Sequence, residues 1–169
     1  MPPKRFDWVP SAYTDYLQNI TIREATLADM DILLQFEQGV IAAERPFDPT
    51  LKDEHINYYD LNEFITAPNI YLALAELNGQ VIGSGYARIE TSKIYLKHRQ
   101  YAYLGFMYVL PQYRGKGVNK LIIQALKNWA LKQGITELRL QVYNQNAPAI
   151  KAYEKVGFSR HMIEMRMGL

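Results

Sequence analysis

The stretch 112–119, which reads QYRGKGVN, is the first candidate for a chemical role in this sequence. It follows an apolar, strand-like run and precedes an amphipathic helical pattern. Backbone N–H groups that open a helix lack partners and lie at the positive end of its dipole. Gly115 and Gly117 permit close backbone approach, and Arg114 and Lys116 add positive charge. The stretch therefore predicts a loop that holds a phosphate or a pyrophosphate.

The same stretch has other interpretations. It could be a tight strand-to-helix turn that happens to be basic. No Lys-Ser or Lys-Thr pair follows the second glycine, and the three-glycine dinucleotide fingerprint is missing. A nucleotide triphosphatase is therefore a weak alternative.

A second group of candidate residues lies in the stretch 142–158, which reads VYNQNAPAIKAYEKVGF. Asn146 is suited to cap a short helix. Taken alone, Tyr153 is more simply a core tyrosine, so these residues gain a chemical meaning only together with the first loop.

Composition bounds the class of protein. The 169 residues suit one domain, and a hydrophobic content of 49% suits a globular core. The excess of two positive charges disfavours a protein built to hold nucleic acid. No cysteine is present, which excludes a disulfide scaffold and a cysteine nucleophile, and the histidines are too scattered to suggest a metal site.

No apolar run approaches the length of a membrane span and the N-terminus lacks a signal-peptide core, so we expect a cytoplasmic location and no membrane partner.

Hydrophobic periodicity and turn signals predict the strands and helices that would hold these residues in place. Residues 1–18 are expected to form an N-terminal arm, and residues 19–169 one domain. Asn78-Gly79 predicts a hairpin. The expected elements are strands at 20–23, 70–77, 80–89, 101–109 and 137–143, helices at 26–43, 51–65, from 118 to Gly134 and from Asn146 to Gly157, a polar loop at 91–100, and closing strands at 158–167. This order predicts an α/β fold in which a central mixed sheet carries helices on both faces, with a right-handed parallel crossover after residue 101.

The two stretches together resemble the GCN5-related N-acetyltransferase (GNAT) family. Arg-Gly-Lys-Gly at the start of a helix is similar to its acetyl-CoA signature, and Asn-x-x-Ala-x-x-x-Tyr-x-Lys-x-Gly-Phe to its closing signature. The opening Ile22-Arg23-x-Ala25-Thr26-x-x-Asp29 is also similar to the family's first strand and helix. Where the family's pattern has Gly or Ala, this chain has Asn119 in one register; in another, Gln112, Gly115 and Gly117 fit. Asn tolerates positive φ, so we expect the loop to keep its function.

The resemblance implies roles for particular residues. Main-chain groups of Met107 and Val109 would pair with the pantetheine arm of acetyl-CoA, Asn146 would contact it, and Tyr153 would protonate the leaving thiolate. The full set implied to bind the coenzyme is Met107, Tyr108, Val109, Gln112, Tyr113, Arg114, Gly115, Lys116, Gly117, Val118, Asn119, Asn146, Ala149 and Tyr153.

The general base is the open question. The positions where many relatives carry an acid hold Gly105 and Phe106. Glu90, Glu37 and Glu44 are candidates, although each is more simply explained as a solvated surface acid. A water chain, or an amine that binds already neutral, would also serve. Aromatic residues could wall the acceptor pocket or simply pack a helix on the sheet: Phe47, Tyr58, Tyr59 and Phe64.

The resemblance implies an acetyltransferase that moves acetyl from acetyl-CoA to a primary amine by direct attack in a ternary complex. The acceptor would be a small-molecule amine or an amine of a protein or peptide. A module that binds acyl-CoA without transfer is the alternative, motivated by the missing strand acid and by Asn119. Relatives often form dimers, so a homodimer is a further expectation.

Overall fold

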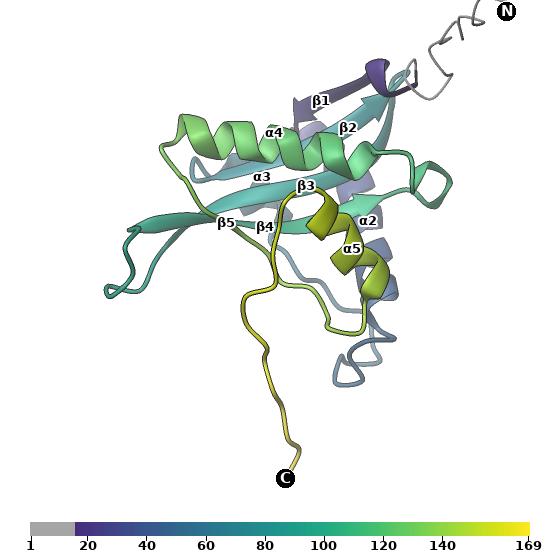
Figure 1. The fold of residues 1–169 in the computed structure, drawn as a ribbon. Helices are drawn as coiled ribbons and strands as arrows, with labels where there is room; N and C mark the ends of the chain where they lie inside the picture. Colours follow the sequence, from purple (N-terminus) through teal and green to yellow (C-terminus); the bar gives the residue numbers. More distant parts are fainter. Residues whose placement is uncertain (1–15) are drawn as a thin grey trace, which may run out of the picture.

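A five-stranded mixed sheet forms the centre of the protein, in a computed structural model that describes residues 16–169 (Figure 1). The strand order is β1-β2-β3-β4-β5. Neighbouring strands are antiparallel except for β4 and β5, which are parallel. The strands are β1 (Ile20–Glu24), β2 (Ile70–Leu77), β3 (Gln80–Thr91), β4 (Gln100–Val109) and β5 (Leu138–Arg139). The mixed sheet and its parallel crossover, predicted from the sequence, are confirmed.

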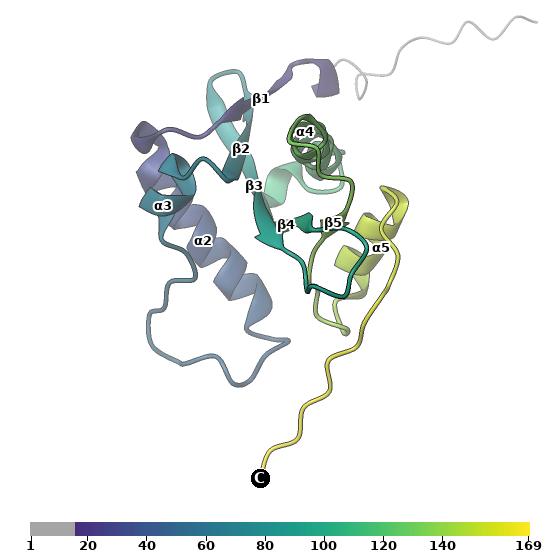
Figure 2. The same cartoon turned by 90° about the vertical axis from the view of Figure 1, so that its left-hand side faces the viewer.

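Helices cover both faces of this sheet, as Figure 2 shows edge-on. One face carries α2 (Met30–Glu44) and α3 (Leu61–Thr66), and the other carries α4 (Val118–Lys132) and α5 (Ala147–Lys155). Side chains alternate along a strand, so each face has its own core. In β2, Leu72 belongs to the core under α2 and α3, whereas Ala73 belongs to the core under α4.

Local signals in the sequence explain several boundaries. The hairpin between β2 and β3 turns at Asn78 and Gly79, which have φ of 50° and 80°. A capping box between Thr26 and Asp29 opens the first helical segment, which starts as a 3-10 turn (Leu27–Asp29) before α2. Gly134 ends α4 with a φ of 76°, as expected for a residue after a helix C-terminus.

The helix predicted over residues 51–65 is wrong for its first ten residues, because only α3 is helical there. The buried carboxylate of Glu37 accounts for the difference. It accepts the backbone N–H groups of Tyr58 and Tyr59 at 2.7 and 2.8 Å and the side-chain amide of Asn57 at 2.6 Å. Those N–H groups are thereby bound to α2 rather than to a helix of their own.

The C-terminal part also differs from the prediction. The strand expected over residues 137–143 is only two residues long, and residues 158–169 contain no strand. A closing strand needs a neighbour with free ladder groups, and so short a β5 offers few. The chain after α5 instead runs away from the body as an extended tail (Figure 1). The predicted N-terminal arm lies outside the described residues up to residue 15, and residues 16–18 form a helical turn.

Candidate active site

A bulge near the end of β4 shapes the centre of the molecule. The register between β3 and β4 shifts between Ser84 and Tyr86, and Phe106 has a φ of 54°. The Ser84 hydroxyl donates to the Phe106 carbonyl at 3.0 Å and fixes the bulge. A bulge bends its strand and re-aims the residues beyond it.

The end of β4 has a free edge on the side away from β3. In the described part of the chain, β5 pairs only with Ala102 and Tyr103. The backbone groups between residues 104 and 109 that point away from β3 therefore have no strand beside them. Exposed ladder groups of this kind can pair with an extended ligand.

A cavity of about 370 Å³ opens along this edge. Four segments supply its walls: the end of α2, the end of β4 with the following loop, the chain after β5, and α5. The lining residues are Val40, Ala43, Glu44, Phe47, Met107, Tyr108, Val109, Arg114, Gln141, Val142, Tyr143, Asn146, Ala149 and Tyr153. Seven of the residues expected to bind the coenzyme are thus brought together: Met107, Tyr108, Val109, Arg114, Asn146, Ala149 and Tyr153.

Gly39 allows α2 to approach β4 at this cavity. A Cβ added to Gly39 would lie 2.5 Å from the ring of Tyr108, which also contacts Phe36 with ring centroids 4.8 Å apart. A larger residue at position 39 would force α2 away from the wall that Tyr108 forms.

The glycine-containing loop leads directly into α4. A short 3-10 turn (Pro111–Tyr113) precedes it, and Gly115 and Gly117 have φ of 71° and 85°. Gly117 is the N-cap of α4, so the first N–H groups of that helix are free of helical partners. Gln112, Arg114, Gly115 and Lys116 are exposed. The loop therefore presents N–H groups and two cations to solvent, as predicted.

Arg114 bridges the loop and the cavity. Its Nε donates to the Val109 carbonyl at 2.8 Å, and its guanidinium lies 5.5 Å from the centre of the Tyr108 ring. The Val109 carbonyl is one of the main-chain groups expected to bind the pantetheine arm. A ligand that used this carbonyl would share it with Arg114 or displace the Arg114 side chain.

Glu44 is the acid that the fold brings into the cavity. It is the last residue of α2, and burial raises the pKa of its carboxyl, helped by the charge of Asp48 and opposed by the Tyr58 hydroxyl. Burial raises the pKa of five surrounding tyrosines, and the charge of Glu44 adds to each shift: Tyr58, Tyr59, Tyr103, Tyr143 and Tyr153. A carboxyl whose pKa is raised in this way holds its proton more readily than an exposed glutamate does, which suits a group that exchanges protons with a substrate.

The other two acid candidates do not line this cavity. Glu90 forms an ion pair with Arg88 on β3. Glu37 is fully buried and its oxygens are occupied by the residue 57–59 segment. Glu44 is therefore the one of the three that could reach a substrate in the cavity.

Tyr153 lies on α5 and faces the same cavity. Burial, with the charge of Glu44 as the next cause, raises the pKa of its hydroxyl to about 12. A hydroxyl with so high a pKa keeps its proton at neutral pH and can donate it. Asn146 caps the N-terminus of α5 by accepting the Ala149 N–H at 3.3 Å, and Asn146, Ala149 and Tyr153 all line the cavity.

Sequence reasoning missed several lining residues. Val40, Ala43, Gln141, Val142 and Tyr143 line the cavity, but they carried no chemical signal of their own. Of the aromatic residues considered as a pocket wall, Phe47 lines the cavity, whereas Tyr59 and Phe64 pack around Phe106 and Tyr86 in the core. Residues that line a cavity from several different elements and loops share no fixed spacing in the sequence, so no pattern predicts them.

Within residues 16–169, no group of three or more His, Asp or Glu side chains is arranged to hold a metal ion. Among the helices in this range, none has the length and apolar character that crossing a bilayer requires.

Comparisons with known proteins show the family to which this chain belongs. Residues 36–158 match the model of the Acetyltransferase (GNAT) family. An N-alpha-acetyltransferase from Sulfurisphaera tokodaii is 29% identical over 143 residues, which cover 81% of this chain and 78% of that protein. Two solved structures share the fold. The tetramutant of the BH1408 protein from Bacillus halodurans has a TM-score of 0.78 and 17% identity, covering 88% of this chain and 99% of that one. A "predicted acetyltransferase with acetyl-CoA" from Clostridium acetobutylicum has a TM-score of 0.66 and 19% identity, covering 88% and 96%.

The family match, together with the fold, defines an acyltransferase of the GNAT type. The chain belongs to the GNAT family of acetyltransferases. It is an N-acetyltransferase with acetyl-CoA as the acetyl donor. The family, the fold and the donor expected from the sequence are confirmed.

Proposed function

We propose that this enzyme acetylates a primary amine by direct attack on acetyl-CoA within a ternary complex. The observation that carries the proposal is the shared cavity of Glu44 and Tyr153 beside the free edge of β4. One residue there can accept a proton and the other can donate one. The chain has no cysteine to form a thioester intermediate, which favours direct transfer.

The donor would bind along two elements. The N–H groups of residues 115–119 would hold its diphosphate, with Gln112, Tyr113 and Lys116 around them. Main-chain groups of Met107 and Val109 would hold the pantetheine arm, and Asn146 and Ala149 would border it. Because Arg114 holds the Val109 carbonyl in this structure, it would move toward the diphosphate when the donor enters.

The chemistry then moves two protons off the amine and one proton onto the leaving sulfur. An amine arrives as an ammonium ion, and Glu44 takes its proton, directly or through a water molecule. The neutral nitrogen attacks the thioester carbon, whose oxygen the Met107 N–H would polarise. A carbon–nitrogen bond forms, the carbon–sulfur bond breaks, and Tyr153 protonates the leaving thiolate. The second proton of the attacking nitrogen then returns to the Tyr153 oxygen, directly or through a water molecule, and Glu44 releases its proton to solvent.

The acceptor could be a small amine or an amine of a peptide, and the Sulfurisphaera relative, an N-alpha-acetyltransferase, supports including peptides in a test. The test measures thiol release from acetyl-CoA over a panel of amines and peptide N-termini, beside calorimetric titration of the coenzyme. We expect the amount of thiol released to equal the amount of acetylated amine formed. Tight binding with no release from any acceptor would favour the non-catalytic module. A cytoplasmic location and a homodimer stay predictions.

A further inference from the structure

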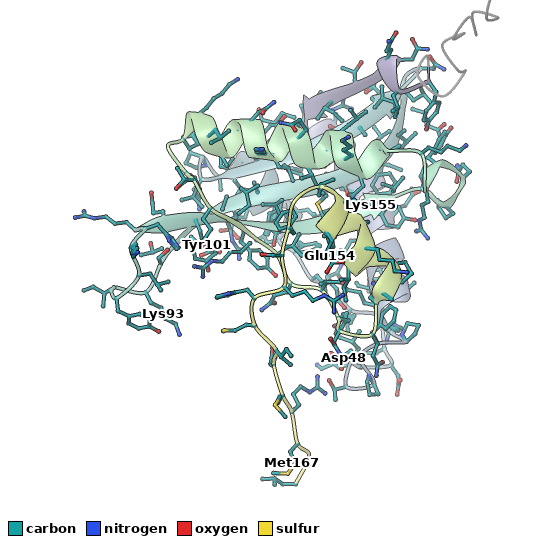
Figure 3. The ribbon with its side chains drawn as sticks, viewed as in Figure 1. Asp48, Lys93, Tyr101, Glu154, Lys155 and Met167 are labelled. Carbon is teal, nitrogen blue, oxygen red and sulfur yellow. The ribbon has the colours of Figure 1, made fainter. Side chains whose placement is uncertain are left out.

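Asp48, labelled in Figure 3, lies in the loop after α2 and contacts a residue that lines the active-site cavity. Its Oδ2 accepts the Tyr143 hydroxyl at 3.3 Å, and Tyr143 is a wall of the cavity. The ring of Phe47, another wall residue, stacks on Tyr143 with centroids 5.9 Å apart. The carboxylate is therefore tied directly to the aromatic pair that lines the cavity.

The Asp48 carboxylate is built to stay charged and in place. Its Oδ1 accepts the Thr50 hydroxyl at 2.5 Å and the Thr50 backbone N–H at 2.9 Å, and its side chain is only 13% exposed. These hydrogen bonds from Thr50, followed by the effect of Arg166, lower the pKa of Asp48 to about 2. A fixed, ionised carboxylate is suited to hold a permanent cation rather than to exchange protons.

A cation from far along the chain already occupies this position. Arg166, in the extended C-terminal tail, has its Nη1 at 3.4 and 3.5 Å from the two oxygens of Asp48, and its Nη2 donates to the Thr50 hydroxyl at 3.2 Å. Its side chain is 55% exposed. The tail around it has no strand or helix and presents Ile163, Met165 and Met167 to solvent. Long contacts from an exposed side chain on such a segment contribute little stability, so a ligand could replace them.

The two acids at this end of α2 therefore differ in the way that a substrate with two amino groups would require. Glu44 faces the cavity with a pKa raised by burial, whereas Asp48 stays ionised beside Tyr143. One amino group must lose its proton before attack, and a second would keep its charge.

We propose that Asp48 binds a second positive charge of the acceptor, so that diamines and larger polycationic amines are preferred over monoamines, and that Arg166 of the tail holds this position until the acceptor displaces it. This inference rests on the proposed function, since it names the acceptor class for the same cavity.

The test compares putrescine with n-butylamine, which differ only in the second amino group. In the full-length enzyme we expect kcat/KM for putrescine to exceed that for n-butylamine by about tenfold. Asp48→Asn should remove most of this ratio and change the n-butylamine value by less than about twofold, because the amide keeps an acceptor for Thr50 but carries no charge. Arg166→Gln should lower KM for putrescine by about twofold to threefold at unchanged kcat, and this gain should vanish in the Asp48→Asn background.

Arg160→Gln is the matched control, because Arg160 lies on the same tail but pairs with Glu154 at 2.9 Å. This variant should leave kcat/KM unchanged for both amines. The inference would be overturned if wild-type kcat/KM were about the same for putrescine and n-butylamine. It would also be overturned if Asp48→Asn kept the preference for putrescine, or lowered kcat/KM equally for both amines.

Failure of the proposed function would look different, because neither amine would then release thiol although acetyl-CoA binds. In that case calorimetric titration of putrescine into the coenzyme-loaded wild type and Asp48→Asn proteins decides. Binding weakened about tenfold by the substitution supports the cation site, and equal binding overturns it.

Discussion

The pKa values of two carboxyl groups and one tyrosine hydroxyl at the cavity are shifted differently, because the surroundings of these groups differ. Burial raises the pKa of Glu44, hydrogen bonds from Thr50 lower the pKa of Asp48, and burial raises the pKa of Tyr153 to about 12. Environments that separate pKa values in this way distinguish acid from base. At the residue scale, the proposed roles follow from burial and hydrogen bonding rather than from residue type alone.

Tyr153→Phe removes the proposed proton donor and little else, because the ring is retained. We expect kcat to fall by about a hundredfold, with the dissociation constant of acetyl-CoA changed by less than about threefold. Steady-state kinetics and calorimetry on the same samples measure the two effects. Tyr95→Phe, at a position that is 74% exposed on the 92–99 loop, serves as the control. A Tyr153→Phe enzyme as fast as wild type at every pH would exclude the acid role.

Glu44→Gln tests the base. A base must be deprotonated, so the wild-type rate should decline as the pH falls through the raised pKa of Glu44, above its ordinary value of 4.5. The glutamine variant should lose about a hundredfold in kcat and lose this acidic limb of the pH profile. The same change at Glu90, which lies outside the cavity, should have little effect. If instead Glu90→Gln is the damaging change, the assignment of Glu44 is wrong.

The residues that could be predicted were those with a fixed pattern along the chain. Gly117, Asn146 and Tyr153 lie where two short motifs place them, and the cavity brings Asn146 and Tyr153 together. Glu44 could not be separated from Glu37 and Glu90, because burial and partners decide between them and neither is written in the spacing. Tyr143 and Gln141 reach the cavity only because β5 stops after two residues.

At the scale of elements, the N-terminus of α4 is the part on which donor binding depends. Gly117→Ala places a Cβ at a φ of 85° and should cost about 1 kcal/mol of folding free energy. It should also weaken coenzyme binding by about tenfold, because the strained loop no longer presents its N–H groups in the same direction.

Gly134→Ala is a matched control at the other end of α4, with a φ of 76° and open space around the added Cβ. It should cost similar stability, measured by denaturant unfolding, and leave coenzyme binding unchanged. Equal loss of binding in both variants would mean that stability alone explains the effect.

The start of α2 offers a separate test of an element. Arg23 donates to both oxygens of Asp29 at 2.9 and 2.8 Å, and the Thr26 N–H donates to one of them at 2.8 Å. These contacts, that of Arg23 first, lower the pKa of Asp29 from 3.8 to about 2. The stabilisation is therefore full above the unfolded value and disappears as the pH falls toward the folded one.

Asp29→Asn should accordingly lower the free energy of unfolding by on the order of 1–2 kcal/mol at neutral pH, and by much less near pH 2. Urea unfolding at several pH values measures this. Asp31→Asn, an exposed change in the first turn of α2, should cost less. A pH-independent effect of Asp29→Asn would contradict the ion-pair explanation.

Elements with strong local signals were predictable, and those decided by tertiary contacts were not. The hairpin at Asn78-Gly79 and α4 follow from turn chemistry and periodicity. The 57–59 segment is extended because Glu37, twenty residues away, binds its backbone. The tail alternates apolar and polar residues like a strand, but a strand forms only where a neighbour can pair with it.

At the scale of the whole molecule, the site exists because four distant segments meet where the sheet opens. β5 covers only the first part of β4, so the remainder faces α5 (Figure 2). The glycine-containing loop lies at one end of this gap, and Glu44 lines its wall. An extended donor could therefore span from the N-terminus of α4 to the acid and the tyrosine.

The most direct test of this account is a crystal structure of the protein with acetyl-CoA. The account predicts the diphosphate within hydrogen-bonding distance of the N–H groups of residues 115–119, the pantetheine arm along Met107 and Val109, and the sulfur beside the Tyr153 hydroxyl. A coenzyme bound elsewhere on the protein, or a sulfur remote from Tyr153 and Glu44, would contradict it.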